Sequence, residues 1–426
     1  MVSLKGKKLL ILGAGPVETT LVTHAKELGI YTIVTDNNTD HSISPAKDLS
    51  DEYWDISYAD IDTLEKKCIS DGIDGIISGY SEIRVENNIK LCERLGLPCY
   101  INMDQLDITR DKIKFKECCR NSGVPVIREY SSIEEVDSYP VIIKPTDRAG
   151  SIGVSVATNY DELVKAYNYA MEMSLTKHVI IEEYIYKDNA NKFDVYYGVV
   201  DGEITYLGCD DVLNSQYNGF NKVIQNGWVL PSIYEKAFLD STDHLLKRMI
   251  KNMGIKNGYI FFSGFSNTKC EFRFFECGFR LCGGHLYNYF PKIGLYNNMD
   301  LFLSYALTGS ASSILDDVKP GRPLKNATIN IYAKAGTISQ IKGFESLSGI
   351  PCCNFVMKHA RIGQKCVDDR AILSKIGMAY FCSESADELA SAVKKMYEFV
   401  SVLDTDGNDM IFDRVDAGVI KHWWDE

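Results

Sequence analysis

The sequence predicts a fold of mixed α/β and α+β class, arranged as three consecutive segments. In the first segment, an apolar run at 8–12 is followed by glycines, a helical pattern and a second apolar run at 31–35, which is the order of a βαβ unit. In the second segment, strand-like runs flank the turn residues 201–202 and 267–268, so two hairpins are expected. In the third segment, from about residue 327, short strands alternate with turns before a helical pattern at 385–401.

Length and composition agree with this organisation. The 426 residues correspond to about three domains at roughly 150 residues each. Hydrophobic residues make up 45% and charged residues 24%, values that exclude a disordered or collagen-like chain. The 13 cysteines are scattered and show no CxxC spacing with partnering histidines, so we expect reduced thiols.

Net charge and hydropathy restrict the partners of the protein. The formal net charge of −12 means that the protein as a whole repels nucleic acid and anionic membrane surfaces. No run of about 18 or more apolar residues is available to span a bilayer. We therefore expect a cytoplasmic protein with no nucleic acid and no membrane partner, in which a bound anion is held by a local cluster of basic residues.

The first segment contains a candidate anion site. Gly13 and Gly15 lie between the first strand and the next helix, the layout that places an anion over a helix N-terminus. Glu18 occupies the place of the third glycine of the dinucleotide fingerprint, which disfavours a nicotinamide cofactor.

Glu82 is a candidate substrate residue in the same segment. It follows a short apolar run at 75–78 and precedes a helical pattern at 83–95. Ligands of open α/β sheets bind beyond the carboxyl ends of the strands, so Glu82 is placed to meet a substrate. A solvated acid at the start of its helix is the alternative.

A lysine and a loop of small residues predict phosphate binding in the second segment. A short strand at 141–145 delivers Lys144 at its end. Backbone N–H groups of the following loop can close on phosphate oxygens, while the lysine supplies a point charge. The lysine precedes the glycines, so the loop is not a Walker motif. The candidate residues of the loop are Arg148, Gly150, Ser151 and Gly153.

Three further groups of polar residues accompany predicted elements of this segment. A helix expected at 109–122 carries Lys112 near its start, and a strand at 178–185 ends in two acids and an aromatic residue. Beyond the second hairpin, Glu276 and Arg280 are four residues apart and could share one polyphosphate, the acid through Mg²⁺ and the arginine directly. His285 follows Gly283 and Gly284, two glycines that could bring a helix N-terminus close to a substrate carboxylate. The alternative is that His285 caps the helix.

Taken in order, these residues resemble the ATP-grasp superfamily, particularly the branch with biotin carboxylase, the large subunit of carbamoyl-phosphate synthetase and the L-amino acid ligases. The resemblance implies an N-terminal Rossmann-like (preATP-grasp) substrate domain at 1–106. It implies a central ATP-grasp module of two α+β subdomains at 107–325, with a small lid subdomain at about 125–185. A C-terminal β-rich, barrel-like lobe would occupy 326–426.

The resemblance also implies roles for the polar residues. Lys112 and Lys144 look like the two nucleotide lysines, Lys144 also acting in catalysis, and Glu276 looks like a metal ligand. Arg280 would act on the transferred phosphate or acyl phosphate. The expected cofactors are ATP and Mg²⁺, or Mn²⁺. The segment expected to contact adenine is Glu182, Glu183, Tyr184 and Ile185.

Two departures from the family pattern concern the metal site. The second metal carboxylate, about twelve residues before Glu276, is replaced by Ser263 or Gly264, and the metal-binding asparagine is Gly278. Magnesium sites can rely on one or two carboxylates with phosphates and waters, so ATP binding is still expected. The number of metal ions stays open.

The expected function is ATP-dependent ligation of a small carboxylate to an amine, through an acyl phosphate and with release of ADP and phosphate. The partners would be a small-molecule carboxylate and an amine, with a homodimer as a possible assembly. The alternatives are another ATP-grasp reaction, such as a purine-pathway carboxylating or formyl-activating enzyme or a small-molecule kinase, and a non-catalytic nucleotide-binding protein.

Overall fold

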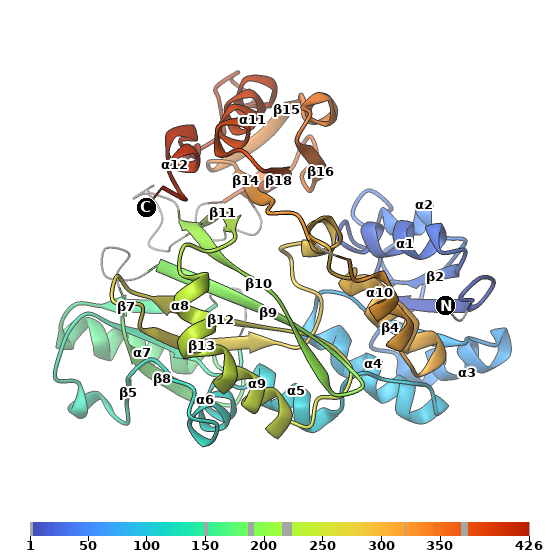
Figure 1. Cartoon of the computed structure of the whole chain (residues 1–426), viewed down its shortest axis with the longest axis horizontal. Coiled ribbons are helices and arrows are strands. Elements are labelled where there is room, and N and C mark those ends of the chain that lie inside the picture. Colours follow the sequence, from blue (N-terminus) through green and yellow to red (C-terminus); the bar gives the residue numbers. More distant parts are fainter. Residues whose placement is uncertain are drawn as a thin grey trace.

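The computed structural model describes residues 3–148, 152–185, 191–214, 224–319, 321–367 and 374–425. Within these residues the strands form four sheets against which helices pack, so the predicted mixed α/β class is confirmed. Figure 1 shows the N-terminal elements on one side of a large central sheet, a small sheet on the other side, and the C-terminal elements above it.

The first sheet is parallel, with the strand order β3-β2-β1-β4. Its strand β1 is buried on both faces, as is usual for a parallel sheet covered by helices. Leu9 and Ile11 pack with residues of α1, whereas Leu10 and Leu12 pack with α3 and α4. The elements are β1 (Lys8–Leu12), α1 (Glu18–Glu27), β2 (Tyr31–Thr35), α2 (Ala46–Leu49), β3 (Glu52–Trp54), α3 (Ile61–Asp71), β4 (Gly75–Ser78) and α4 (Glu82–Leu95).

Two short helices, α5 (Met103–Arg110) and α6 (Lys112–Asn121), follow the first sheet. The single helix expected at 109–122 is therefore interrupted. The reason is Asp111, which has extended backbone angles and whose side chain accepts from the backbone N–H groups of Ile113 and Lys114, capping a new helix. Lys112 is thus the first residue of α6.

A small antiparallel sheet comes next, with the strand order β5-β8-β6-β7. Helix α7 packs against it through Leu163, Ala166 and Ala170, which contact Val141 and Ile143 of the sheet in one core. The elements are β5 (Glu129–Tyr130), β6 (Val141–Pro145), β7 (Ser155–Ala157), α7 (Tyr160–Met173), β8 (Val179–Glu183) and the short 3-10 helix η1 (Ile133–Glu135).

The central sheet is antiparallel, with the strand order β13-β12-β9-β10-β11-β14-β18-β16. Both hairpins expected from the sequence are present, as β9–β10 and β12–β13. One face packs on helices α5, α6, α8 and α9 through large apolar side chains such as Phe193, Tyr197 and Phe262. The second-segment elements are β9 (Asn191–Val200), β10 (Glu203–Asn214), β11 (Gln225–Leu230), α8 (Glu235–Ser241), α9 (Asp243–Asn252), β12 (Gly258–Ser266) and β13 (Phe272–Gly278).

Helix α10 (Asn298–Thr308) joins the first sheet to the central one. Figure 1 shows it beside β4, and the packing is so close that a Cβ atom on Gly75 would lie 2.4 Å from the carbonyl oxygen of Ala306. The chain reaches α10 through 3-10 helices η2 (Leu286–Asn288) and η3 (Phe290–Ile293) and leaves it through η4 (Ser312–Asp317).

The strands of the third segment are divided between two sheets. Strands β14 (Lys325–Tyr332), β18 (Lys375–Ser383) and β16 (Cys353–Lys358) extend the central sheet, because β14 pairs with the otherwise open edge of β11. A separate sheet contains β17 (Lys365–Cys366), β15 (Gly336–Lys342) and β19 (Ser401–Asp404). The remaining elements are η5 (Phe344–Gly349), α11 (Ala386–Phe399) and α12 (Ala417–Lys421).

Helix α11 covers this third segment through buried Leu389, Val393 and Met396. It corresponds to the helical pattern expected at 385–401. Across the described ranges, no helix combines the length and apolar character needed to cross a membrane.

Candidate active site

A buried carboxylate between two lysines lies at the small sheet. Glu182 on β8 is fully buried and forms ion pairs with Lys144 of β6 and Lys116 of α6. Lys144 and Glu182 are diagonal neighbours on the same face of the sheet, which is why they meet. Burial raises the pKa of Glu182, but the attraction of the two lysines outweighs it, and the pKa lies below its ordinary value. Glu182 is therefore ionised at neutral pH.

Lys116 was not selected from the sequence. Its side chain is fully buried, its Nζ donates to the carbonyl oxygen of Ile127 at 3.3 Å, and burial lowers its pKa to about 8. One signal was available, because Lys116 lies four residues after Lys112 and so shares its helix face. The single helix predicted at 109–122 gave no reason to expect that the face with Lys112 and Lys116 is buried.

The rest of the segment expected to contact adenine surrounds this ion-paired group. A fully buried carboxylate is costly when it is unpaired, and the two lysines beside Glu182 offset that cost. Glu183 is half-exposed and accepts from Arg273 Nη1 at 3.0 Å. The backbone N–H of Tyr184 donates to the carbonyl oxygen of Pro140 at 3.1 Å, and Ile185 ends the described range.

Lys112 occupies the space between the small sheet and the central sheet. Its Nζ donates to the carbonyl oxygen of Arg148 at 3.0 Å. Burial lowers the pKa of Lys112, against the attraction of Glu276 and other acids. Lys112 is thus brought near the predicted metal ligand, as an electrostatic neighbour rather than a hydrogen-bond partner.

The predicted phosphate loop is only partly described. The side chain of Arg148 is directed to the end of α7, where its Nε donates to the carbonyl oxygen of Met173 at 2.7 Å. Gly153 has a φ of +75°, and a Cβ atom there would lie 2.6 Å from Cγ of Pro145. Gly150 and Ser151 lie outside the described residues.

A row of polar residues crosses the central sheet on the face turned away from α8 and α9. In register across β13, β12, β9 and β10 lie Glu276, Ser263, Asp194 and Asp210. Directly opposite residues project to the same face, so the three acids share it. Ser263, at the place of the expected second metal carboxylate, separates Glu276 from Asp194. Neither Asp194 nor Asp210 was selected from the sequence, since only strand register brings them into this row.

Two lysines flank the aromatic ring next to Glu276. A β-bulge opposite Ser263 and Gly264 inserts Phe275 as an extra residue in β13. Lys144 Nζ lies 5.3 Å and Lys192 Nζ 5.8 Å from the centre of the Phe275 ring. With Lys112, these cations form a positively charged region beside a carboxylate, an arrangement suited to a polyphosphate and a divalent cation.

Arg280 and Glu82 meet across the boundary between the first sheet and the central sheet. Arg280 Nη2 donates to Glu82 Oε1 at 3.2 Å, and its Nη1 donates to the carbonyl oxygen of Leu281 at 3.1 Å. The guanidinium also lies over the ring of Phe261, 5.5 Å from its centre. The Nε atom of Arg280 is buried and has no hydrogen-bond partner in the described part of the chain.

His285 lies in an aromatic cluster at the same boundary. It is 1% exposed, and its Nδ1 lies 3.1 Å from the hydroxyl of Tyr287, while its ring is 5.3 Å from the ring of Tyr80. Burial lowers its pKa well below the ordinary value, so the ring is neutral. His285 occupies the N-cap position of η2, but its side chain makes no capping hydrogen bond. Gly283 and Gly284 precede it, and a Cβ atom on Gly283 would have open space.

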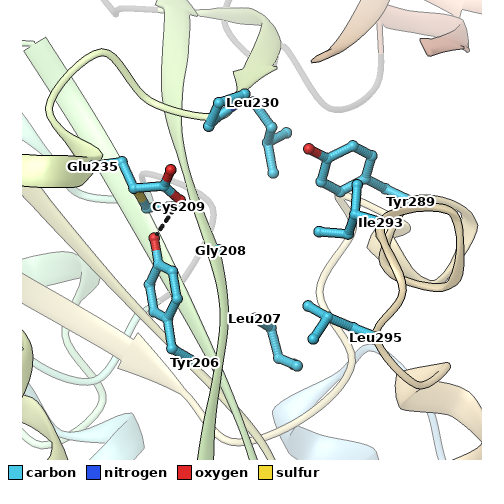
Figure 2. A pocket seen from close by; sticks show the side chains of 10 residues that line it. Tyr206, Leu207, Gly208, Cys209, Leu230, Glu235, Tyr289, Ile293 and Leu295 are labelled. Carbon is cyan, nitrogen blue, oxygen red and sulfur yellow. Dashed lines mark hydrogen bonds between the residues drawn. The ribbon is translucent and has the colours of Figure 1, made fainter. Parts of the chain in front are cut away.

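A separate pocket lies beside β10. Figure 2 shows its apolar lining with Tyr206, whose hydroxyl donates to Glu235 at 2.8 Å. Its volume is about 210 Å³. None of the predicted site residues is among the ten described residues that line it, so the pocket is distinct from the polar face of the sheet.

Comparison with known protein families finds a match in this part of the chain. A family model described as the D-ala D-ala ligase C-terminus matches residues 113–216. The 2-oxoglutarate carboxylase small subunit of Hydrogenobacter thermophilus is 28% identical over 225 residues, covering 47% of this chain and 47% of that protein. The chain spans about half the length of the curated relatives it matches.

Two solved structures share the fold over nearly the whole chain. An L-amino acid ligase from Bacillus licheniformis superimposes with a TM-score of 0.76 and 17% identity, covering 94% of this chain and 99% of that one. The biotin carboxylase domain dimer of the Hydrogenobacter thermophilus 2-oxoglutarate carboxylase, solved with MgADP, ADP and bicarbonate, gives a TM-score of 0.74 at 18% identity and 99% coverage of both chains.

Proposed function

We propose that this chain, a relative of the ATP-grasp ligases, is an ADP-forming enzyme that joins a small carboxylate to an amine. The observation that carries the proposal is the position of two lysines at the end of β13: Lys112 is an electrostatic neighbour of Glu276, and Lys144 lies over the ring of the adjacent Phe275. Arg280, paired with Glu82, follows on the same chain segment. Phosphoryl transfer to a carboxylate needs positioning and charge neutralisation rather than covalent help from the enzyme. These residues supply both.

ATP would bind between the small sheet and the central sheet. Lys112 and Lys144 face the polyphosphate, and residues 182–185 line the adenine. Both oxygens of Glu182 face lysines, so the adenine contacts come from backbone groups of this segment. Glu182 holds the ammonium group of Lys144 in place.

A divalent cation, Mg²⁺ or Mn²⁺, fits the donor set beside Glu276. No group of three or more His, Cys, Asp or Glu side chains suited to a metal is found among the described residues, so phosphate and water oxygens must complete the shell. When bound, the ion neutralises charge on the transferred phosphoryl group. Glu276 is the protein ligand that the geometry offers.

The reaction then proceeds in two steps. A carboxylate oxygen of the substrate attacks the γ-phosphorus of ATP, the bond to the β–γ bridging oxygen breaks, and ADP leaves, giving an acyl phosphate. The amine attacks the acyl carbon and loses a proton, and inorganic phosphate leaves as the amide bond forms. Arg280, held by Glu82, stabilises the negative charge of the acyl phosphate.

The division of the chain belongs to the same proposal. Residues 1–106 form a Rossmann-like substrate domain, 107–325 the ATP-grasp module with a lid at about 125–185, and 326–426 a barrel-like lobe. A homodimer is the proposed assembly, as in the biotin carboxylase domain dimer.

An ADP-release screen tests the function. Carboxylates are crossed with amines, and hydroxylamine is added to trap an acyl phosphate as a hydroxamate. Wild-type protein should give ADP and hydroxamate with at least one carboxylate. Glu276→Ala should lose both while keeping the fold. Lys144→Ala should lose both and also lose stability, because it leaves the buried carboxylate of Glu182 with Lys116 alone. Full turnover in either variant would contradict the assignment.

The serine at position 263 favours one second candidate, a nucleotide-binding protein without turnover. In that case the wild-type protein would bind ATP tightly, yet release no ADP with any carboxylate and amine of the panel. Calorimetry with ATP, run beside the screen, separates the two functions.

A further inference from the structure

A lysine without a counter-charge lies at the start of β18. Lys375 is the first residue of this strand, and its Nζ donates to the sulfur of Met378, a weak acceptor, at 3.7 Å. Burial lowers the pKa of Lys375 to about 8, and no carboxylate of the described residues offsets this effect. The ammonium group therefore stays charged at neutral pH. A cation that is largely removed from water needs a partner, and a bound anion would supply one.

The surroundings of this lysine come from three parts of the chain. Met378 packs in one cluster with Phe355 of β16 and with Val17, which follows the glycines of the first segment. The ring of His285, which follows the second hairpin, lies 5.7 Å from the ring of Phe355. Lys375, Phe355 and Val17 are each partly exposed, so solvent reaches this place. A small ligand therefore has access to the ammonium group.

Two uncharged histidines accompany Lys375. The backbone N–H of His359 donates to the carbonyl oxygen of Ile376 at 2.8 Å, which places His359 beside the lysine. Its Nε2 atom is buried and has no hydrogen-bond partner in the described ranges. Burial, and then the charge of Lys375, lower the pKa of His359 to about 3 and that of His285 well below its ordinary value. These three residues, the Lys375 cluster, combine one cation with imidazole N–H donors, the groups that bind an oxyanion.

The Lys375 cluster lies near the arginine that acts on the acyl phosphate, yet apart from the nucleotide lysines. Arg280 and Cys282 are two residues apart, which allows at most about 7 Å between their Cα atoms. The backbone N–H of His285 donates to the carbonyl oxygen of Cys282 at 3.3 Å, so this turn adds at most about 7 Å. Lys112 and Lys144 belong to α6 and β6, and neither shifts the pKa of Lys375. The phosphates of ATP and a second anion would therefore occupy different places.

We infer that the Lys375 cluster binds a second oxyanionic group of the acid whose carboxylate is activated, and that this acid is therefore a dianion. The inference rests on the proposed function and narrows its substrate class. The second group is a carboxylate or a phosphate, because the oxygens of both accept from an ammonium and from imidazole N–H groups. With the reacting carboxylate at Arg280, such a molecule lies along residues 280–285 with its other end at Lys375.

The test compares dianionic acids with monocarboxylic acids of the same chain length. ADP release is measured with dicarboxylic acids, with carboxylic acids that carry a phosphate or phosphonate group, and with the matching monocarboxylic acids, in the presence of hydroxylamine as an uncharged nucleophile. Each set includes members with and without an amino group. The wild-type protein should prefer one or more dianionic acids by at least about 10-fold in kcat/KM, the size expected for charge-assisted hydrogen bonds. The set that contains the preferred acid identifies the oxyanion as carboxylate or phosphate.

Lys375→Met distinguishes ligand binding from a structural role. Methionine keeps much of the length of the side chain and removes the charge, so the preference for dianionic acids should disappear. The substitution also removes a cation that has no partner, so the Tm should be equal to or above that of the wild type. The matched control is Lys358→Met, because Lys358 is an exposed lysine on the neighbouring strand β16. This variant should keep both the preference and the Tm.

The outcomes separate the inference from the proposed function. Equal wild-type rates with dianionic and monocarboxylic acids, or a preference kept in Lys375→Met, would overturn the inference while leaving the ligase function intact. If no acid gives ADP, the proposed function fails. Calorimetry with inorganic phosphate, in the presence of a non-hydrolysable ATP analogue that fills the nucleotide site, then decides the anion site. Binding that Lys375→Met loses supports the site, and no binding, or equal binding by both proteins, overturns it.

Discussion

Arg280 Nη2 lies 3.2 Å from Oε1 of Glu82, and this contact joins the end of β13 to the first residue of α4. Glu82 begins the helix that follows β4 of the first sheet, Arg280 follows β13 of the central sheet, and the two are separated by 198 positions in the chain. Both were selected from the sequence for separate reasons, Glu82 as a substrate residue and Arg280 as a phosphate residue. Their contact makes the position of the arginine depend on how the first sheet sits against the central one.

Substitutions at this pair should affect turnover more than stability. Both side chains are partly exposed, so the ion pair contributes at most about 1 kcal/mol to the free energy of unfolding. Arg280→Lys should lower kcat of ADP release by about 100-fold or more, because a lysine cannot replace the fork of the guanidinium. Glu82→Gln should give a smaller loss. Assays of ADP release measure the loss of turnover, and urea unfolding of the same variants measures the change in stability. A free energy of unfolding for Glu82→Gln far below that of the wild type would assign Glu82 a structural role.

Lys116→Met should destabilise the protein strongly. The substitution leaves the buried carboxylate of Glu182 with Lys144 alone, and removing one partner of a buried ion pair costs about 3–5 kcal/mol. ATP affinity should also fall, since Lys144 would be drawn further toward Glu182. Urea unfolding and calorimetry with ATP measure the two effects.

Lys114→Met on the same helix serves as the control for Lys116→Met. Lys114 is exposed and pairs with Asp107 at the surface, so its loss should cost less than about 1 kcal/mol. Similar losses in the free energy of unfolding for the two variants would show that the buried ion pair contributes no more to stability than the surface pair.

Gly153→Ala should weaken the small sheet and ATP binding together. The backbone at Gly153 has a positive φ, and the new Cβ would lie 2.6 Å from Pro145 Cγ and 2.8 Å from Met173 Cβ. A loss of about 2 kcal/mol in the free energy of unfolding is expected, from backbone strain plus the clash. Gly363 also has a positive φ but nothing within 4 Å of a Cβ, so Gly363→Ala should cost about 1 kcal/mol and leave ATP affinity unchanged.

His359 predicts a loss of stability in acid. Burial, and then the positive charge of Lys375, lower the pKa of His359 to about 3 from an ordinary value of 6.5. Between these values the unfolded chain binds more protons than the folded one, so this group's contribution to stability falls as pH drops from 6.5 toward 3. The slope is at most about 1.4 kcal/mol per pH unit. Urea unfolding at several pH values should show that the free energy of unfolding of His359→Gln falls less steeply with decreasing pH than that of the wild type. An identical dependence on pH would exclude His359 as the cause of the loss of stability in acid.

Local patterns were sufficient for the first βαβ unit and for both hairpins, but the short strand β3 was not predicted. The apolar run from Lys8 to Leu12, the helix with its glycine stop and the next strand are all encoded within about thirty neighbouring residues. The same holds for the turns at 201–202 and 267–268. Each of these elements is determined by side-chain periodicity and by residues with a strong turn preference.

Contacts between distant strands were not accessible in this way. The pairing of β11 with β14, roughly a hundred residues further on, has no local signature, so nothing in the sequence predicted that strands of the third segment join the central sheet. Asp194 and Asp210 are ordinary polar residues until the register of β9 against β10 sets them opposite each other. Lys116 is buried because it pairs with Glu182 of another element. The helix pattern alone predicts that Lys116 is a surface residue.

The continuous ladder from β13 to β16 affects how the protein can be shortened. The strand that ends in Glu276 and the strands of the third segment belong to one hydrogen-bonded sheet. A chain cut after residue 324 would keep every residue proposed to bind ATP, yet it would leave the β11 edge without a neighbour. An open edge of this kind recruits other chains, so such a fragment should be recovered as aggregate.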